Sequence, residues 1–422
     1  MKLSQTEKEQ LKLFKEDINL TIKANSRSGF INYYAIRRFE RDFMSSLTSF
    51  YTNSFASNQM NLLFEGLCFV VKKIGKPLNM DDSDGTTSNI MYEVMDFYKQ
   101  CILMMPPKET AEALKWFEKN FSNEKIIDYI QEYILNIYIC MFNDEKSLKS
   151  KLTFFDKYLK EKFDLNGVQC FDNFEYEKIA IAKINTMKLL GFSEIEVVSF
   201  MEKFSSIHKV CLLLADSYIA KKEYEKAEQS LYKLIEENKR YPGIIHNAQK
   251  KLYDVYKAAD NTEKLKDILQ TLLLKEYTFN TNLYYEYKSY FPNDEWHSKI
   301  KEIFSISRKF EFDIYCEEKM YDCLFESLKR KHLKNVGNYF IKKYFSVLMP
   351  KYSNQLVEMF VENLEKEIKP LNNREKYKSF AKNLVFLVND LQALEKATEL
   401  REKWFVEYKN KPALIEELNR AF

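Results

Sequence analysis

Glycine is scarce in this chain. The sequence has 8 glycines in 422 residues, under about 2% where an average protein has about 7%. Tight turns and phosphate-binding loops need glycine, because it adopts left-handed backbone conformations without a steric penalty. Folds built around a glycine-rich phosphate loop are therefore disfavoured, and the sequence contains no phosphate-loop, dinucleotide or His-Glu-x-x-His motif.

Long hydrophobic runs are also missing. The longest apolar stretches, residues 62–71 and 133–142, are interrupted and span about ten residues, whereas a membrane helix needs about 20. Residues 1–8 are charged and lack the apolar run of a signal peptide. The 7 cysteines are odd in number and widely spaced, as is typical of a reduced intracellular protein. We therefore expect a cytoplasmic protein with no membrane partner.

Neither sign of charge dominates. The 65 basic residues exceed the 62 acidic ones by 3, and the two signs are interspersed as on exposed helix faces. The longest basic cluster comprises Lys329, Arg330, Lys331 and Lys334. A nucleic-acid footprint needs a broader one-sided patch, so we interpret the cluster as a solvated face. Nucleic acid stays a second, less favoured partner.

Apolar residues at helical spacing fill most of the chain. Prolines and glycines fall between these runs, with breaks near Pro77 and Gly167, and therefore mark helix boundaries. Ser193 and Glu196 form a capping-box pattern that predicts a helix start, and Pro242 fits the first turn of another helix. Alternating runs bounded by hairpin turns are absent from the sequence, so we expect almost no sheet.

Two segments in the middle of the chain repeat one pattern at a distance of 38 residues. The first contains Leu214, Ala215, Tyr218, Ala227 and Leu231, and the second contains Leu252, Tyr253, Tyr256, Leu265 and Leu269. A period in this range, built from paired helices, is typical of a solenoid whose units bury their apolar faces on one another. The pattern resembles tetratricopeptide repeats, with small or aromatic residues where two helices cross.

The sequence therefore predicts an all-α, tetratricopeptide-like helical-hairpin solenoid of roughly eight to ten stacked pairs. Residues 166–422 form its repeat region in this interpretation. Residues 1–165 lack a clear repeat spacing, and we expect them to form a separate N-terminal helical domain.

Short motifs outside the two repeats support a family resemblance. In chain order they are Gly29-Phe-Ile-Asn-Tyr33, Asp81-Asp-Ser-Asp-Gly85-Thr86, Leu283-Tyr-Tyr285 with Trp296 downstream, and Lys411-Pro-Ala-Leu-Ile-Glu-Glu-Leu418. This order is similar to the tetratricopeptide-like helical-repeat region of bacterial SWIM zinc-finger proteins, over about residues 28–420. The resemblance implies a macromolecular interaction module, in proteins sometimes linked to nucleic-acid or helicase machinery.

The zinc finger of that family is not present. Its metal site needs a Cys-x-Cys pair followed by Cys-x-His, and this chain has neither. We therefore expect no zinc, and the link to nucleic acid weakens because the finger that would touch DNA is missing.

The acidic cluster at residues 81–84 has two interpretations. If Gly85 were the sixth residue of a calcium-binding EF-hand loop, Met80 and Met91 would hold its first and twelfth positions, and neither side chain can bind a hard cation. Aspartate, serine and glycine before a helix also suit a turn with a helix cap. We favour the capping turn.

The remaining candidates for chemistry are weak. Cys316 and Cys323 are seven residues apart with His332 beyond, whereas structural zinc sites pair ligands two to four residues apart, so we expect buried thiols. The aromatic residues at 284–291 suit either base stacking or core packing, and core packing is favoured. None of the 4 histidines lies in a ligand or nucleophile motif, so we expect no catalytic residue, metal or cofactor.

A binding surface follows from the repeat geometry. The first helix of each tetratricopeptide pair lines the groove, so side chains pointing away from the buried leucines and tyrosines of those helices are exposed there. These residues are Asp216, Asn247, Lys250, Asp254 and Lys257. The alternative is that they are ordinary exposed polar residues.

We expect a non-catalytic intracellular scaffold that binds a protein or peptide through these residues. The alternatives are an accessory protein of nucleic-acid machinery and a peptide-sensing regulator built on tetratricopeptide repeats. An enzyme is a remote option.

Overall fold

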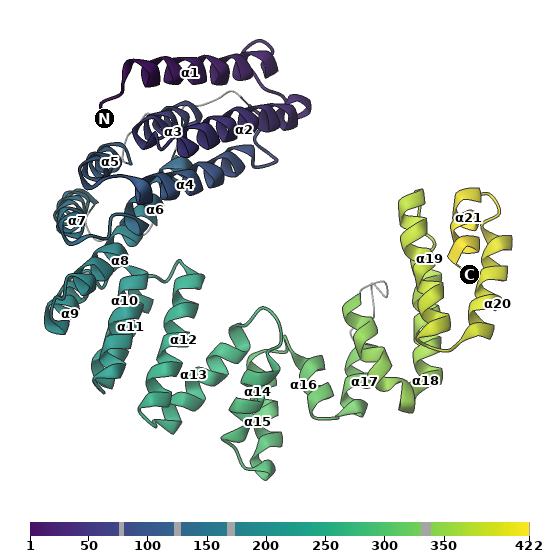
Figure 1. Cartoon of the computed structure of the whole chain (residues 1–422). Coiled ribbons are helices and arrows are strands. Elements are labelled where there is room, and N and C mark those ends of the chain that lie inside the picture. Colours follow the sequence, from purple (N-terminus) through teal and green to yellow (C-terminus); the bar gives the residue numbers. More distant parts are fainter. Residues whose placement is uncertain (76–79, 122–127, 167–173, 331–338, 422) are drawn as a thin grey trace. The chain divides into compact units, whose positions relative to one another are not determined.

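The computed structural model describes residues 1–75, 80–121, 128–166, 174–330 and 339–421 (Figure 1). Across these ranges the chain forms 21 helices and no strand; its β-bridges are isolated pairs, Arg27 with Phe30 and Ile31 with Met80. The all-α prediction is confirmed. The expected chain breaks at Pro77 and Gly167, the basic residues Lys331 and Lys334, and His332 lie outside the described residues.

The chain divides into two compact units, residues 1–261 and 262–422. The border falls inside the second sequence repeat, between its two helices α12 (Pro242–Ala258) and α13 (Thr262–Lys275). The expected boundary at residue 165 falls at the end of α7 (Glu145–Asn166), which packs against α8 (Phe174–Leu189). A separate domain at residues 1–165 stays a prediction.

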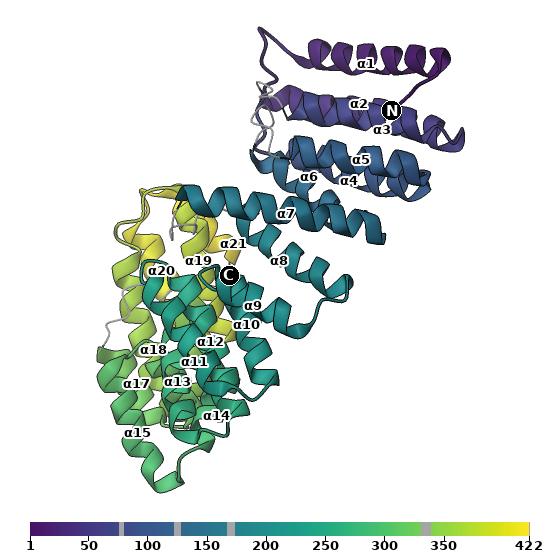
Figure 2. The ribbon, with the colours of Figure 1, turned by 90° about the vertical axis from the view of Figure 1, so that its left-hand side faces the viewer.

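The first unit is a stack of helices, and Figure 2 shows its first part in layers, from α1 at the top through α2 with α3 and α4 with α5 to α7. Besides α7, α8 and α12, its helices are α1 (Gln5–Asn25), α2 (Tyr33–Ala56), α3 (Met60–Ile74), α4 (Thr86–Met104), α5 (Pro107–Asn120), α6 (Asp128–Cys140), α9 (Glu194–Lys203), α10 (His208–Ala220) and α11 (Tyr224–Glu237). Each even-numbered helix packs on the next even-numbered one, from α2 to α12. We call this series the even-helix row.

The hairpin α10–α11 shows why the repeat pattern folds this way. Leu214 and Tyr218 of α10 are buried, as are Ala227, Leu231 and Leu234 of α11. Their spacing of three and four residues places each set on one helix face. Ala227 is fully covered, since a small side chain lets two helices approach closely. The expected assignment of these residues to the core is confirmed.

Local signals in the sequence set the helix ends. Ser193 and Glu196 form the expected capping box at the start of α9, in which each side chain accepts from the other residue's backbone N–H. Gly191, just after α8, has a φ of 76°, a left-handed conformation that glycine adopts without strain. Pro242 occupies the first turn of α12 as expected.

The acidic cluster before α4 is a capping turn. The Asp82 carboxylate accepts a hydrogen bond of 2.9 Å from the backbone N–H of Thr87, and that of Asp81 accepts one of 3.1 Å from Ser83. Gly85 directly precedes α4 with a φ of 73°. Within the ranges the structure describes, no three His, Cys, Asp or Glu side chains are grouped to hold a metal ion.

The second unit continues the helical pattern. Besides α13, its helices are α14 (Thr281–Ser289), α15 (Asn293–Ile306), α16 (Glu311–Glu317), α17 (Tyr321–Arg330), α18 (Tyr339–Glu367), α19 (Arg374–Asn389), α20 (Leu394–Glu407) and α21 (Pro412–Ala421). Buried side chains from α16 to α21 form one hydrophobic cluster. α18 is interrupted two residues after Pro350, at Tyr352, where φ is −125° and the backbone leaves helical geometry, as is usual near a proline within a helix.

The aromatic residues at 284–291 contribute to the core of this unit. Tyr284 and Tyr287 are buried, and their rings lie 5.6 and 5.9 Å from the Trp296 ring, both edge-on. Core packing is therefore confirmed for these two tyrosines, whereas Tyr285 is partly exposed. Among the described residues, no helix is both long and apolar enough to cross a membrane.

Candidate binding surface on the even-helix row

The five residues expected to bind a partner lie on two neighbouring helices of the even-helix row. Asp216 is on α10, the other four are on α12, and all five are exposed. Those on α12 are Asn247, Lys250, Asp254 and Lys257. Steps of three and four residues place them along one face of the helix, and α10 packs directly against α12.

Lys251 joins two of these residues. Its ammonium lies 2.8 Å from Asp216 Oδ1 on α10 and 3.1 Å from Asp254 Oδ2 on its own helix. Burial opposes the charge, since the side chain is only 21% exposed, but hydrogen bonds to the two carboxylates outweigh it and the pKa of Lys251 is raised. The lysine therefore holds both aspartates in place.

His208 forms the second connection across the row. Its Nδ1 lies 3.8 Å from the Glu177 carboxylate on α8, and its Nε2 lies 3.4 Å from the Asn247 amide nitrogen on α12. Burial lowers the pKa of His208, although the Glu177 charge acts in the opposite direction. Glu177 also pairs with Lys209 of α10 at 2.7 Å. Three successive helices of the row are thus joined by polar side chains.

The same arrangement continues toward the amino end. Lys178 of α8 donates to Glu132 at 2.7 Å and to Asn136 at 3.0 Å, both on α6. Glu40 of α2 accepts hydrogen bonds of 2.8 Å from Thr86 and Asn89 of α4. Ion pairs or hydrogen bonds between side chains therefore recur along the even-helix row.

Sequence reasoning missed the residues that make these connections. Lys251 lies 35 positions after Asp216, and Lys209 lies 32 after Glu177. Both separations are close to the 38-residue repeat. A search for opposite charges about one repeat apart could have found both pairs, because equivalent positions of stacked units are spatial neighbours.

The remaining two predicted residues are lysines. Lys257 donates a 2.6 Å hydrogen bond to the Tyr253 hydroxyl and lies 5.0 Å from the centre of the same ring, which fixes its direction. Lys250 is exposed one helical turn before Asp254. The structure thus places all five residues on one surface, and their contact with a partner stays a prediction. The surface offers hydrogen-bond donors, acceptors and charges of both signs.

Comparisons with known proteins give little further guidance. No protein family and no curated protein matches the chain. One solved structure, described as a circular tandem repeat protein with novel repeat topology and enhanced subunit contact surfaces, aligns over 98% of this chain and 97% of its own at 12% identity, with a TM-score of 0.21. At that score the likeness carries no argument, and the all-helical architecture stands on the helices of this chain.

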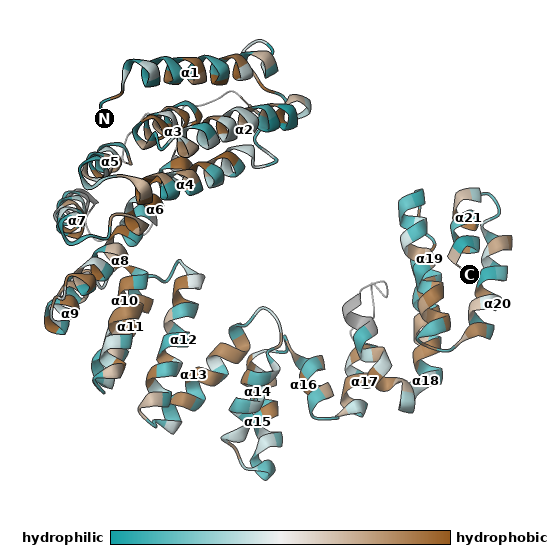
Figure 3. Ribbon diagram, viewed as in Figure 1, coloured by the Kyte–Doolittle hydropathy of each residue, from teal (hydrophilic) through white to brown (hydrophobic). Residues whose placement is uncertain are grey.

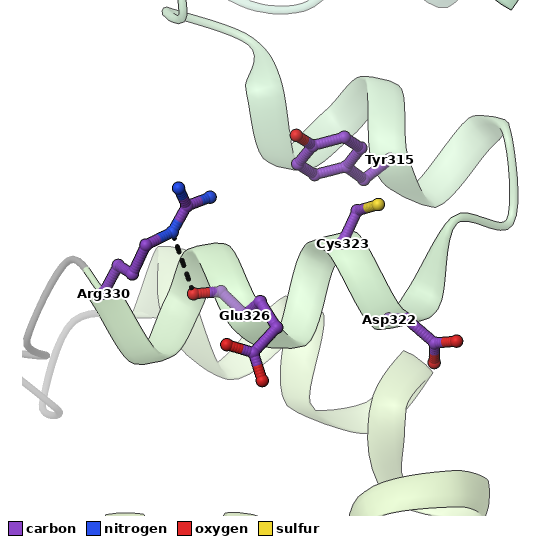
Figure 4. Close-up of a pocket in the computed structure, with 5 residues that line it drawn as sticks. All are labelled: Tyr315, Asp322, Cys323, Glu326 and Arg330. Atoms are coloured by element: carbon purple, nitrogen blue, oxygen red, sulfur yellow. Dashed lines mark hydrogen bonds between the residues drawn. The ribbon is translucent and has the colours of Figure 1, made fainter.

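A hollow in the second unit is the other candidate (Figure 4). Its volume is about 440 Å³, and it is lined by Tyr315, Asp322, Cys323, Glu326 and Arg330. Arg330 Nε donates to the Glu326 carbonyl at 3.3 Å, and Asp322 accepts from Lys351 and Tyr352. The even-helix row stays the favoured candidate, because it brings together all five residues that the sequence predicted.

The interpretation of both cysteines in this region as buried thiols is wrong for Cys323, which is exposed. It lies on the side of α17 that lines the hollow, while Leu324 and Leu328 are buried in the core. Cys316 is half-buried, and burial raises its pKa to about 11.

Proposed function

We propose that this protein is a non-catalytic helical-repeat scaffold that binds a protein or peptide along the even-helix row. The observation that supports it is the surface formed by α8, α10 and α12, where exposed polar groups from adjacent helices are held in position by Lys251 and His208. Proteins in which helical units repeat present such extended surfaces to partners. The proposal places the protein in the cytoplasm and requires no metal or cofactor.

The spacing of the helices suits an extended peptide. Packed helices lie about 8 to 10 Å apart, so α8, α10 and α12 together span about 16 to 20 Å. An extended chain advances about 3.3 Å per residue, and a segment of about five or six residues would therefore cross all three helices. Asp216 and Asp254 can accept its backbone N–H groups, while Asn247, Lys250 and Lys257 can donate to its carbonyls or carboxylates.

A displayed peptide library selected against the full chain tests this proposal. The selected peptide is then titrated against a variant that combines Asn247→Ala, Lys250→Ala and Lys257→Ala. We expect its affinity to fall at least about tenfold, because each well-made hydrogen bond or charged contact contributes roughly 0.5 to 1.5 kcal/mol. The matched control combines Lys226→Ala and Lys233→Ala on α11, outside the even-helix row.

If the triple variant on α12 and the control variant on α11 lose affinity equally, the peptide binds elsewhere on the chain. Failure to select any peptide that binds the wild-type chain above background would contradict the scaffold proposal itself. Circular dichroism of each variant shows whether the helices are intact, so that a folding defect is not counted as lost binding.

The second candidate is an accessory protein of nucleic-acid machinery. It rests on the ordered motifs that resemble the SWIM family and on the basic excess of 3 charges. Two of those motifs meet in the structure, where the backbone N–H of Asp81 donates to the Ile31 carbonyl at 2.9 Å. This candidate predicts binding to single-stranded DNA or RNA that weakens steeply with added salt.

A peptide-sensing regulator is a variant of the leading proposal. It predicts that a short selected peptide raises the melting temperature of the chain, because a ligand that binds only the folded state stabilises it. A peptide that binds without changing the melting temperature would count against it.

A further inference from the structure

A hollow opens between the first two helices of the chain, α1 and α2, and the start of α3 contributes to its lining. We call it the α1–α2 hollow. Its volume of about 320 Å³ lies within the range of about 300 to 1,000 Å³ found for clefts that bind small molecules. Such clefts combine an apolar lining with a few polar groups that fix the orientation of the ligand, and the α1–α2 hollow has both.

The apolar part of the lining is fixed in place. Phe14 of α1 is buried, and its ring stacks on that of Phe50 from α2, with the ring centres 3.9 Å apart. Gly66 of α3 leaves room for the Phe50 ring, since a Cβ there would lie 2.2 Å from Phe50 Cε1. A site that is formed before binding loses little conformational entropy when a ligand enters.

The polar part of the lining is not used by the protein itself. Ser54 is only 2% exposed, yet its hydroxyl makes no hydrogen bond to any residue that the structure describes. The same is true of the side chains of Asp17, Ser49 and Asn53. Buried polar groups normally have a hydrogen-bond partner. Each of these four side chains can accept a hydrogen bond, so the hollow suits a ligand rich in donors.

Asp17 gives the hollow a negative charge. It is the charged residue of the lining, and it has no ion pair within the described ranges. Successive residues of an α-helix are about 100° apart, so the lysines of α1, at positions 8, 12, 15 and 23, project at least about 120° away from Asp17. On α2, Arg41 pairs with Asp42 at 3.1 Å, and Arg38 donates to Asn25 Oδ1 at 2.7 Å. These contacts leave the charge of Asp17 uncompensated.

The two ends of the hollow differ. Gln10 and Asp17 are seven residues apart on α1, which is about 10 Å along the helix. Asp17 supplies a carboxylate at one end, and at the other the Gln59 amide donates to Gln10 Oε1 at 3.4 Å. Phe14 lies between them, and Figure 3 shows hydrophilic and hydrophobic residues alternating along α1. A ligand in the hollow therefore meets a charge at one end and aromatic rings beside it.

We propose that the α1–α2 hollow binds a small organic amine, with its primary ammonium at Asp17 and an aromatic or alkyl body on the stacked rings of Phe14 and Phe50. The three N–H groups of the ammonium are donated to the Asp17 carboxylate and to hydroxyls of α2. The apolar body removes water from the rings, which is favourable. This site is on other helices than the peptide-binding surface of α8, α10 and α12, and its occupant binds independently.

Ligand-observed NMR titration of the full chain tests the proposal with three probes of similar shape. The probes are phenethylammonium, phenethyl alcohol and hydrocinnamate, which carry a positive, a neutral and a negative head group on the same phenyl body. Phenethylammonium should bind most tightly and hydrocinnamate least, and added salt should weaken the binding of phenethylammonium. The proposal is overturned if phenethylammonium does not bind, or binds no more tightly than phenethyl alcohol.

Two variants locate the site, each with a matched control. Ser49→Phe places a ring inside the hollow and should weaken phenethylammonium binding at least about tenfold, because the ring clashes with the ligand. Ser45→Phe adds the same ring at an exposed position of α2 outside the lining and should leave the affinity unchanged. Asp17→Asn should weaken binding several-fold, as expected for one exposed charge pair, and the neighbouring Glu16→Gln should weaken it less. Equal effects of a variant and its control overturn the proposal.

A lysine side chain of a partner protein presents the same ammonium without an aromatic body. The peptide acetyl-Gly-Lys-Gly-amide should therefore bind more weakly than phenethylammonium. If it binds as tightly, the hollow receives a partner's lysine and the small-molecule proposal is overturned. Asp17 is exposed, so Asp17→Asn leaves the apolar packing intact. A phenethylammonium affinity that Asp17→Asn does not change overturns the proposal, whatever Ser49→Phe does.

Discussion

Glu318 carries a charge inside the second unit that should contribute measurably to its stability. Its side chain is only 9% exposed. The carboxylate accepts a 2.7 Å hydrogen bond from the Tyr284 hydroxyl and bonds of 2.7 and 2.8 Å from the Lys288 ammonium. Lys288 also lies 5.7 Å from the centre of the Trp296 ring. Substitution of Glu318 by glutamine keeps the shape and removes the charge.

We expect Glu318→Gln to lower the free energy of unfolding of the second unit by about 2 to 3 kcal/mol. Hydrogen bonds to a charged group contribute about 1.5 to 3 kcal/mol each. Glutamine can still accept a hydrogen bond from Tyr284, so the stability lost is mainly that of the charged hydrogen bonds with Lys288. The control is Glu302→Gln, whose partner Lys299 lies at 2.9 Å but whose own side chain is 51% exposed. An exposed pair of this kind contributes less than about 1 kcal/mol.

The effect should depend on pH. Burial acts to raise the pKa of Glu318, but the hydrogen bonds from Lys288 and Tyr284 outweigh it and the pKa is lowered from its ordinary value. A carboxyl whose folded pKa is lowered adds stability above its unfolded pKa of about 4.3, and this contribution is lost as the pH falls through the folded value. The difference between wild type and Glu318→Gln should therefore be full at pH 7 and shrink below about pH 4.

Hydrogen exchange measured by mass spectrometry on α14 reports this contribution locally, because it detects opening of single elements. The Glu318→Gln variant should exchange faster than Glu302→Gln at pH 7 under the same denaturant concentration. Equal exchange in the two variants would refute the reasoning. So would a Glu318→Gln defect of the same size at pH 7 and pH 3, since the charge would then not be its source.

Three further predictions concern the first unit. Lys151 is buried and donates to the carbonyl of Ile139 in α6 and to that of Met141 just after this helix. Burial lowers its pKa to about 8, so its charged form is disfavoured in the folded state. Urea unfolding should therefore show the wild type gaining up to about 3 kcal/mol over Lys151→Met between pH 7 and pH 10. Gly66→Ala would place a Cβ 2.2 Å from Phe50 Cε1. Overpacking of this kind costs about 1 to 3 kcal/mol, which should exceed the gain in helix propensity, so the melting temperature should fall. It should fall less in a Phe50→Leu background. Ser193→Ala removes the α9 capping box and should lower the free energy of unfolding by about 1 kcal/mol. An unchanged urea midpoint would contradict this prediction.

The helices were predictable because each depends on residues close together in sequence. The spacing of apolar residues predicted which face of α10 is buried. Ser193 predicted the start of α9, and Pro242 predicted the start of α12. The break in α18 at Tyr352 follows from the nearby Pro350. The packing of this helix was not predictable, because residues distant in sequence, such as Phe386, contact the same hydrophobic cluster. Cys323 was misassigned because its exposure depends on which face of α17 the rest of the unit covers.

The candidate surface was predictable in part. The repeat identified which helix face is exposed, and Asp216 and Asp254 were found in this way. Lys251 was not found, because its side chain reaches a neighbouring helix. Only the packed structure shows that its ammonium lies 2.8 Å from Asp216 Oδ1. The unit border after Asn261 leaves no mark in the sequence, since the 38-residue pattern runs through it without interruption.

Three ion pairs between described helices of the even-helix row share one direction, which bears on how a peptide would bind. In each pair the acid is on the earlier helix and the lysine on the later one: Glu132 with Lys178, Glu177 with Lys209, and Asp216 with Lys251. Pairs this exposed add little stability, but a carboxylate has lone pairs left after it accepts from one lysine.

Asp216 is therefore already ordered and can still accept a hydrogen bond from a partner. Ordering a free side chain on binding costs about 0.5 to 1.5 kcal/mol, a loss that Asp216 largely avoids. If a peptide crosses α10 and α12, Asp216→Asn should weaken it more than Lys250→Ala does, because asparagine loses the pairing with Lys251 and frees both side chains. Equal effects of the two substitutions would show that the pairing does not organise the surface for binding.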